Sequence, residues 1–306
     1  DLARGLVTGR TGAVGVIIPD VSGPLYSAMA RGVGEVLEPL GMHYMMVSDN
    51  RNREQEESAI ELLLGRQVDA LIIVGSLLPP DRLAALLRGG PPVVLIQREG
   101  QVADGFPTVT LDNAGGVKAA VDHLLARGHT RIAHIAGARS EGAQRRELFT
   151  DNVRRAGLEP GPIVAGDSRE EGGLQVGTEL LERGGFTAVF CSNDRLALGF
   201  YRALSRAGLS IPEDVSVVGF DDLPWTAYLQ PPLTTVRQPA LEMGRVAAER
   251  ILLALSGERP PEDVLVDSEL IERQSVATRE EVGEGGASTS GRQEAIATDR
   301  TTFGEV

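Results

Sequence analysis

The chain has 306 residues, 42% of them hydrophobic, which is enough for two domains that each bury a core of their own. Its 30 Lys and Arg residues are outnumbered by 43 Asp and Glu residues, and the formal net charge of -13 has the wrong sign for a surface that holds a phosphate backbone unaided. No apolar run approaches the roughly 18 residues that span a bilayer, and the first residues lack the apolar segment of a signal peptide. We therefore expect a cytoplasmic protein with no membrane partner, in which this part of the chain binds nucleic acid poorly.

Apolar runs and helical patterns alternate over the first third of the chain. Runs typical of strands cover 14–20, 43–49, 70–74, 93–96 and 108–112, and helical periodicity covers 25–41, 53–66 and 81–89. The first helix is expected to close at Gly41, a natural C-cap. This βαβα order predicts an α/β fold with a parallel sheet and helices on both of its faces.

The same order restarts after Asp112. Helical patterns at 114–128, 145–157, 172–184 and 195–208 alternate with strand-like runs at 131–137, 162–166, 188–194 and 215–222. The single cysteine, Cys191, excludes an internal disulfide and a cysteine-based metal cluster, and its apolar surroundings predict a buried strand residue. Two α/β units in tandem are therefore predicted, with a join near Asp112.

The last part of the chain differs in kind. Residues 233–240 are extended and contain a proline, 241–257 form one more amphipathic helix, and 264–276 supply one or two closing strands. That helix comes too late for the second unit's own series, so it is in a position to pack back onto the first unit. From Thr278 onward Gly, Ser, Thr and Glu dominate, which predicts a disordered tail over 278–306.

Polar residues gather where the predicted strands end, which is where open parallel sheets bind ligands. They are Asp20, Asp49, Asn50, Gln97, Arg98 and Asp112 in the first unit, and Arg139, Asn193, Asp194, Asp221 and Asp222 in the second. An acid between a strand and a helix commonly caps the helix, and this alternative stays open for the single acids of the set. Arg139 and Arg145 lie around a helix start, where a positive charge gains nothing from the helix dipole, and this favours a ligand contact.

Asp221 and Asp222 place two like charges side by side, which is costly unless each carboxylate has a partner of its own. Adjacent residues on an extended chain point in opposite directions, so the pair makes a poor acid/base couple of the glycosidase kind. One of the two is expected to support the next turn while the other faces a ligand.

Sequence motifs of enzymes are absent. The four histidines lack metal-ligand spacing, and no phosphate loop, dinucleotide fingerprint or nucleophile elbow occurs. We therefore predict a protein that is not an enzyme and uses no metal or cofactor; an enzyme that employs Asp221 or Asp112 is the alternative. Acids, an amide and arginines suit a sugar or nucleoside-like ligand, with Tyr26 and Trp225 either as apolar platforms for it or as packing residues.

Seven segments occur in an order that carries a family resemblance: 9–26, 66–74, 124–137, 187–204, 211–225, 231–244 and 269–276. The combination of "IPEDVSVVGFDD" with "PPLTTVRQP" is the most specific of them. Over residues 1–277 the chain strongly resembles the lac repressor/gal repressor (LacI/GalR) family of bacterial transcription regulators. The resemblance implies a periplasmic-binding-protein-like fold of two Rossmann-like subdomains with parallel sheets, joined by three crossovers.

The resemblance also implies a division of the chain. The N-terminal subdomain would comprise 11–112 and 239–265, and the C-terminal subdomain would comprise 113–238 and 266–277. Residues 1–10 look like the end of a hinge segment, expected to be disordered here, in which Leu6 matches the leucine that wedges into the minor groove. Operator DNA is accordingly expected as a partner only of a full-length protein with a helix-turn-helix upstream.

By position, the family's effector contacts fall at seven residues: Leu25, Tyr26, Asp112, Arg139, Arg145, Asn193 and Asp221. The family pattern departs at Gly23, Leu25, Gln97 and Ser168, which leaves the effector class open between carbohydrate and nucleoside-like molecules. The implied function is that of an effector-binding core that forms a homodimer and couples cleft closure to operator affinity. A periplasmic sugar-binding protein of a transporter shares this fold and is the alternative.

Overall fold

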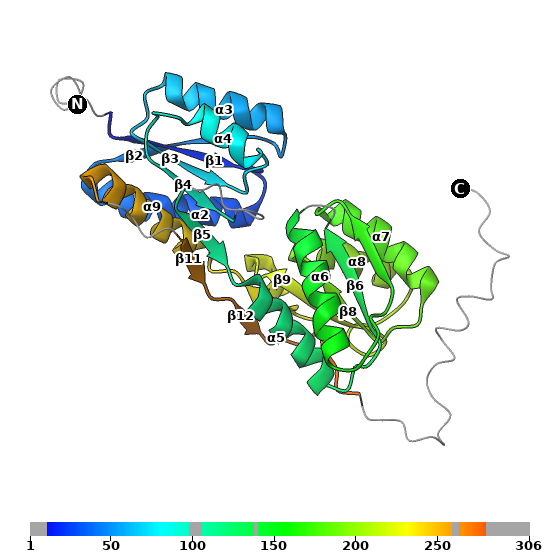
Figure 1. The fold of residues 1–306 in the computed structure, drawn as a ribbon. Coiled ribbons are helices and arrows are strands. Elements are labelled where there is room, and N and C mark those ends of the chain that lie inside the picture. The colour runs from blue at the N-terminus through cyan, green and yellow to red at the C-terminus, as the bar shows by residue number, and fades with distance from the viewer. Residues whose placement is uncertain (1–10, 98–105, 138–139, 259–262, 280–306) are drawn as a thin grey trace, which may run out of the picture. The chain divides into compact units, whose positions relative to one another are not determined.

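The computed structural model describes residues 11–97, 106–137, 140–258 and 263–279, and these form two compact units (Figure 1). Unit 1 consists of Asp1–Asp112 and Pro239–Asp267, and unit 2 of Asn113–Gln238 and Ser268–Val306. The chain therefore passes between the units three times, and each unit is completed by a segment from the end of the chain.

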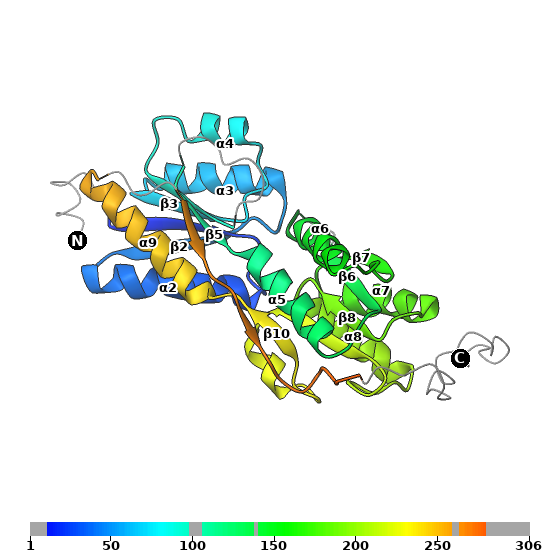
Figure 2. The same cartoon turned by 60° about the horizontal axis from the view of Figure 1, so that its bottom comes forward.

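Unit 1 is built on a six-stranded sheet in the order β11-β5-β4-β3-β1-β2, in which all strands run parallel. The strands are β1 (Ala13–Ile18), β2 (His43–Ser48), β3 (Ala70–Val74), β4 (Val93–Ile96), β5 (Thr108–Leu111) and β11 (Asp263–Val266). The helices are α2 (Pro24–Leu37), α3 (Arg53–Gly65), α4 (Pro80–Leu86) and α9 (Ala240–Ser256). Figures 1 and 2 show α3 and α4 on one face of the sheet and the paired α2 and α9 on the other.

The helix predicted to end at Gly41 closes in two steps. The α-helix ends at Leu37, a 3₁₀ turn covers Glu38–Leu40, and Gly41 then takes a left-handed conformation with φ of 72°. The prolines at 24 and 39 each stand at the start of one of these segments, where a missing N–H costs nothing. The late helix α9 packs on α2 in unit 1, so the chain does return to its first unit.

Unit 2 repeats the design with the strand order β12-β10-β9-β8-β6-β7. Its strands are β6 (Ile132–Gly137), β7 (Ile163–Gly166), β8 (Ala188–Cys191), β9 (Ser216–Asp221), β10 (Thr234–Arg237) and β12 (Glu269–Ile271). Its helices are α5 (Asn113–Ala126), α6 (Ser140–Arg155), α7 (Glu170–Arg183) and α8 (Asp194–Arg206), with a 3₁₀ turn η2 (Pro224–Tyr228) after β9. Helices α7 and α8 cover one face of this sheet, and α5 and α6 lie together on the other (Figure 1). Cys191 is buried in β8, as predicted.

Two expectations about the end of the chain need correction. The short strand β12 runs antiparallel to β10, so the second sheet is parallel except at one edge. Thr278 and Arg279, assigned to the tail from composition, belong to the folded unit: the Arg279 amide donates to the Arg127 carbonyl over 2.7 Å, and its guanidinium donates to the Asp214 carbonyl over 2.9 Å. Composition missed this because the acceptors are backbone carbonyls, which leave no trace in a sequence.

In the part of the chain that the structure describes, no helix is both long enough and apolar enough to cross a membrane.

Candidate functional site

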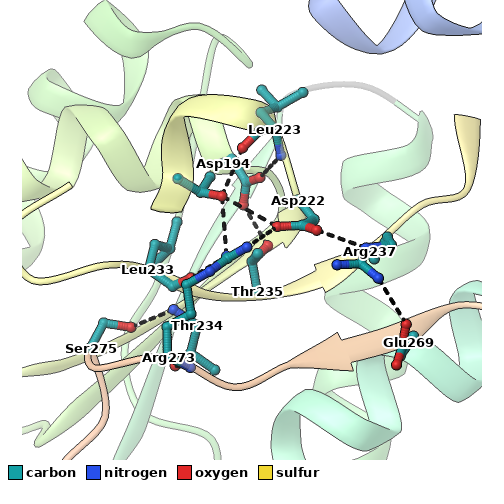
Figure 3. Close-up of polar contacts among 11 residues, drawn as sticks. Asp194, Asp222, Leu223, Leu233, Thr234, Thr235, Arg237, Glu269, Arg273 and Ser275 are labelled. Atoms are coloured by element: carbon teal, nitrogen blue, oxygen red, sulfur yellow. Dashed lines mark hydrogen bonds and ion pairs between the residues drawn. The ribbon is translucent and has the colours of Figure 1, made fainter. Parts of the chain in front are cut away.

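The carboxyl end of β9 separates the two adjacent acids. Asp222 accepts a hydrogen bond from Arg273 over 2.6 Å and another from Arg237 over 2.8 Å, and its side chain is only 9% exposed (Figure 3). Burial by itself raises the pKa of Asp222, but the hydrogen bonds from the two guanidinium groups outweigh burial and hold the pKa below its ordinary range. Asp222 is therefore an ionised structural residue that ties β9 to β10 and to the segment after β12.

Asp221 faces a different set of groups. Its carboxylate accepts a hydrogen bond from the Gln238 side-chain amide, and one of its oxygens lies 3.8 Å from a guanidinium nitrogen of Arg145. Its φ of 128° lies in the left-handed half of backbone space, which is rare for a residue with a side chain. Gln238 escaped the sequence reasoning, although a signal existed: it directly follows β10, and β10 pairs with β9 in a register that sets Arg237 opposite Asp221.

Arg145 is buried, and it lies in the second turn of α6 rather than at its first residue. Its guanidinium donates to the Asn113 side chain over 2.9 Å and to the Ser192 carbonyl over 2.6 Å, and it lies 3.7 Å from the centroid of the Phe220 ring. These contacts fix its position before any ligand arrives, because both hydrogen bonds and the cation–π contact hold the planar group. Arg145, Asp221 and Gln238 are thus brought together at the carboxyl edge of the unit 2 sheet.

At the junction of β8 and α8, Asn193 and Asp194 have roles other than those predicted from the sequence. Asn193 caps α8, since its side-chain oxygen accepts from the Leu196 amide over 2.8 Å, while its amide donates to the Ser168 carbonyl over 3.3 Å. Asp194, for which capping was the alternative, is not the cap: it is the first helical residue and is fully buried. Its carboxyl group accepts from the Thr235 hydroxyl over 2.6 Å and from the Leu223 amide over 2.8 Å (Figure 3).

In unit 1 the predicted site residues are partly engaged in local structure. Tyr26 is 7% exposed, and its hydroxyl accepts from Arg51 over 3.1 Å. Leu25 is half-buried in the first turn of α2. Asp112 is half-buried directly after β5, where its amide donates to the Val266 carbonyl over 2.9 Å.

The other acids of unit 1 stabilise loops rather than cap helices. The Asp20 carboxylate accepts from the Ser22 amide and hydroxyl, and the Asp49 carboxylate accepts from the Arg51 amide. The cap of α3 is Asn52, whose side-chain oxygen accepts from the Glu54 and Gln55 amides. Asp and Asn side chains suit both a loop and a helix N-cap, so only the path of the backbone decides which residue caps the helix.

The other predicted residues are Asn50, whose side-chain amide donates to Gln55 over 2.8 Å, and Gln97, Arg98, Trp225, Arg139 and Leu6. Trp225 is half-buried within η2, the turn that follows Asp222. Arg98, Arg139 and Leu6 lie outside the described residues.

The buried histidines have structural surroundings. His134 is fully buried, its Nδ1 lies 2.8 Å from the Phe190 carbonyl oxygen, and its ring stacks on Phe149 and Phe190. His129 lies between the Thr187 hydroxyl and the Ala277 carbonyl, and burial lowers its pKa to about 4. Among the residues that the structure describes, no group of three or more His, Cys, Asp or Glu side chains is arranged to hold a metal ion.

Two units, each a mostly parallel sheet with helices on both faces and polar residues at the carboxyl ends of its strands, define a periplasmic-binding-protein-like fold. The comparisons with known proteins agree with this class. A family model described as a periplasmic binding protein-like domain matches residues 121–276. The HTH-type transcriptional regulator GalR of Escherichia coli (strain K12) is 36% identical over 285 residues, which cover 90% of this chain and 82% of that protein.

Solved structures give the same result. A LacI family transcriptional regulator from Enterococcus faecium with bound ribose matches with a TM-score of 0.79 and 29% identity, over 88% of this chain and 100% of that one. The lac repressor dimer bound to operator and the anti-inducer ONPF matches with a TM-score of 0.80 and 26% identity, over 90% and 98% of the two chains. The chain belongs to the LacI/GalR family of transcriptional regulators, and the part described is a ligand-sensing regulator core.

Proposed function

We propose that this protein senses a small polar effector, a sugar or sugar derivative, and converts its binding into a change of operator affinity. The observation that carries the proposal is the set formed by Asp221, Arg145 and Gln238 at the carboxyl edge of the unit 2 sheet. Asp221 supplies an acceptor and the other two supply donors, and all three are mostly buried.

This combination suits neighbouring hydroxyl groups. A hydroxyl both donates and accepts, so one sugar hydroxyl can donate to the Asp221 carboxylate while the next accepts from Arg145 or Gln238. The hydrogen bonds of Arg145 to Asn113 and Ser192 organise the donor in advance, which lowers the entropy cost of binding. The ribose bound to the Enterococcus faecium regulator, a protein 29% identical to this one, supports the choice of a sugar over a nucleoside-like effector.

Further effector contacts are proposed residue by residue from the family resemblance. Leu25, Tyr26 and Asp112 follow or lie near strand ends of unit 1, and Asn193 and Trp225 do so in unit 2. Two of these residues also have a role inside the protein: Tyr26 accepts a hydrogen bond from Arg51, and Asn193 caps α8. We propose that each contacts the effector in addition to this role. Arg139 stays a proposed contact on the family resemblance alone.

The proposed output is that of a homodimer acting on operator DNA in the cytoplasm, with the effector shifting a two-state equilibrium for which it has different affinities. The operator-bound lac repressor dimer supports both partners. Exposed apolar side chains in each unit support self-association: Met45 and Met46 on the edge strand β2 are 41% and 44% exposed, and Tyr228 in η2 is 84% exposed.

The proposal is tested by thermal shift with a panel of pentoses, hexoses, their phosphates and purine nucleosides. A ligand present at 100 times its dissociation constant adds about 2.7 kcal/mol to the free energy of unfolding, so a true effector is visible at millimolar concentration even with weak binding. We expect one sugar or sugar derivative to raise the melting temperature. A response to purine nucleosides alone would show that the effector is nucleoside-like rather than a sugar. Recovery of a chemically altered sugar would show that the protein is an enzyme.

A further inference from the structure

Asp194 is a buried carboxyl group whose hydrogen bonds all leave its own helix. It stands at the first position of α8, yet Asn193 already caps that helix. Its two oxygens accept instead from the Thr235 hydroxyl in β10 and from the Leu223 amide, which follows β9 (Figure 3). One side chain therefore joins three segments of unit 2 that are distant in sequence.

The fold accommodates this group at a cost. Burial raises the pKa of Asp194 well above its ordinary range, and the charge of Asp221 raises it further, so an apolar residue would fill the same space more cheaply. The neighbouring strand leaves room for it: a Cβ atom at Gly219 would lie 2.3 Å from an Asp194 carboxyl oxygen. Positions 194 and 219 are thus matched to each other, which points to a specific task for the carboxyl group.

That task is visible in the backbone that Asp194 holds. Leu223 comes directly after two non-glycine residues with positive φ, Asp221 at 128° and Asp222 at 55°. Such conformations are strained and persist only where the surroundings impose them. The chain is fixed on both sides of the turn, by Arg237 and Arg273 on the Asp222 side chain and by Asp194 on the Leu223 amide.

We propose that Asp194 is a positioning residue for Asp221: by holding the Leu223 amide and the Thr235 hydroxyl, it fixes the strained turn that aims the Asp221 carboxylate at Gln238 and Arg145. The link between this positioning and effector recognition rests on the proposed function, whereas the positioning of Asp221 by Asp194 does not. The positioning is therefore measured in the protein without effector, so that a negative result for Asp194 is distinguishable from a ligand panel in which no compound binds.

The chain offers a built-in reporter for this turn. Trp225 is the only tryptophan, and it follows Leu223 by two residues within η2. Acrylamide quenching of its fluorescence measures the exposure of the turn, and hydrogen exchange measures the Leu223 and Gln238 amides. The Gln238 amide donates to the Asp221 carbonyl over 3.2 Å, so its exchange reports on Asp221 directly.

In Asp194→Ala we expect exchange at Leu223 and Gln238 to become at least about tenfold faster, the size expected when a protecting hydrogen bond opens locally, and Trp225 to be quenched more strongly. Asp194→Asn keeps an oxygen that accepts from the Leu223 amide, so it should restore most of the protection. This rescue separates positioning from a general loss of stability, and it remains measurable if the alanine variant folds poorly.

Glu56→Ala is the matched control. Glu56 is a buried carboxylate in unit 1 that likewise accepts from a hydroxyl, that of Ser76 over 2.5 Å, and from a backbone amide, that of Leu77 over 2.7 Å. Its loss should lower stability and leave Trp225 quenching and exchange at Leu223 unchanged. The proposal is overturned if Asp194→Ala leaves the turn as in the wild type, or if Asp194→Asn accelerates exchange throughout unit 2 as much as alanine does.

Discussion

At the scale of single residues, Asp221 and Asp222 show how one short stretch serves two purposes. Asp222 is neutralised by two arginines, whereas Asp221 has an amide as its hydrogen-bond donor and a guanidinium nitrogen 3.8 Å away. Asp222 is thus bound to two arginines that hold β10 and the segment after β12, whereas Asp221 lies with Gln238 and Arg145 at the proposed effector site, and this difference separates the structural acid from the proposed contact.

Asp221→Ala should weaken effector binding by about 1–3 kcal/mol, the scale of leaving polar groups unpaired, which is a roughly 5- to 150-fold rise in the dissociation constant. Calorimetry with the sugar that gives the largest thermal shift measures this. Asp151→Ala removes an exposed carboxylate from α6 of the same unit and should leave the affinity as it was. An affinity unchanged within twofold in Asp221→Ala would remove this residue from the site.

His134 makes stability depend on pH. Burial lowers its pKa from 6.5 to about 3, against the opposing hydrogen bond with the Phe190 carbonyl. Between these two values the unfolded chain binds a proton that the folded protein does not, so this contribution to stability is complete above pH 6.5 and is lost as the pH falls toward 3. The expected slope is about 1.4 kcal/mol per pH unit for one such group, and buried His129 acts in the same direction.

Urea unfolding of His134→Phe at several pH values between 7.5 and 5 tests this. Phenylalanine keeps the stacking between Phe149 and Phe190 but cannot take up a proton, so the variant should show a shallower loss of stability with falling pH. The comparison concerns the slope and not the stability itself, because losing the hydrogen bond between the His134 ring and the Phe190 carbonyl lowers stability at every pH. Equal slopes in the two proteins would contradict the assignment.

At the scale of elements, α2 and α9 of unit 1 approach so closely that two glycines are required. A Cβ atom at Gly244 would lie 2.0 Å from the Met29 carbonyl oxygen, and one at Gly32 would lie 2.0 Å from the Leu241 carbonyl oxygen. Each helix therefore places a glycine against the backbone of the other, and neither backbone can move aside as a flexible side chain would. This crossing attaches the late helix to the first unit.

Gly244→Ala should lower the free energy of unfolding by about 1–3 kcal/mol through overpacking. Gly65→Ala is the matched control: it also adds one methyl group within a helix of unit 1, where no atom beyond its neighbouring residues and the nearby helix backbone lies within 4 Å. It should be neutral or stabilising by up to about 1 kcal/mol. Urea denaturation monitored by circular dichroism measures both. A Gly244→Ala protein as stable as Gly65→Ala would show that the helices can separate at no cost.

At the scale of the whole molecule, both units depend on the end of the chain. Strand β11 completes the first sheet beside β5, and β12 and the residues up to Arg279 complete the second. Neither unit is a continuous stretch of sequence, so truncation near residue 238 would remove an edge strand from each sheet as well as α9.

The proposed dimer is a prediction at this scale. At micromolar concentration, light scattering should give twice the mass of one chain, because the edge strand β2 presents Met45 and Met46 to solvent. Met45→Glu with Met46→Glu should shift the protein toward the monomer. Leu62→Glu alters an apolar side chain on α3 that is 49% exposed and should leave the dimer intact. A wild-type protein of monomeric mass would contradict the proposal.

The sequence by itself determined the succession of elements, the α/β class and the family. Apolar runs and the helical periodicity between them reflect which residues are buried along the chain. The segments that contain Asn193 and Asp221 carry the motifs of the family. These features are local, and a local pattern can be read without knowing what lies opposite.

Only the tertiary structure decided the partners. Gln238 beside Asp221, Arg145 over Phe220 and Asp194 on Leu223 each join residues from different elements. The same holds for β12, whose antiparallel direction depends on where the chain enters the second sheet, and for Arg279, which bonds to backbone carbonyls. The physical reason is that a polar side chain has several acceptable partners in water, and packing selects one of them once folding has removed the water.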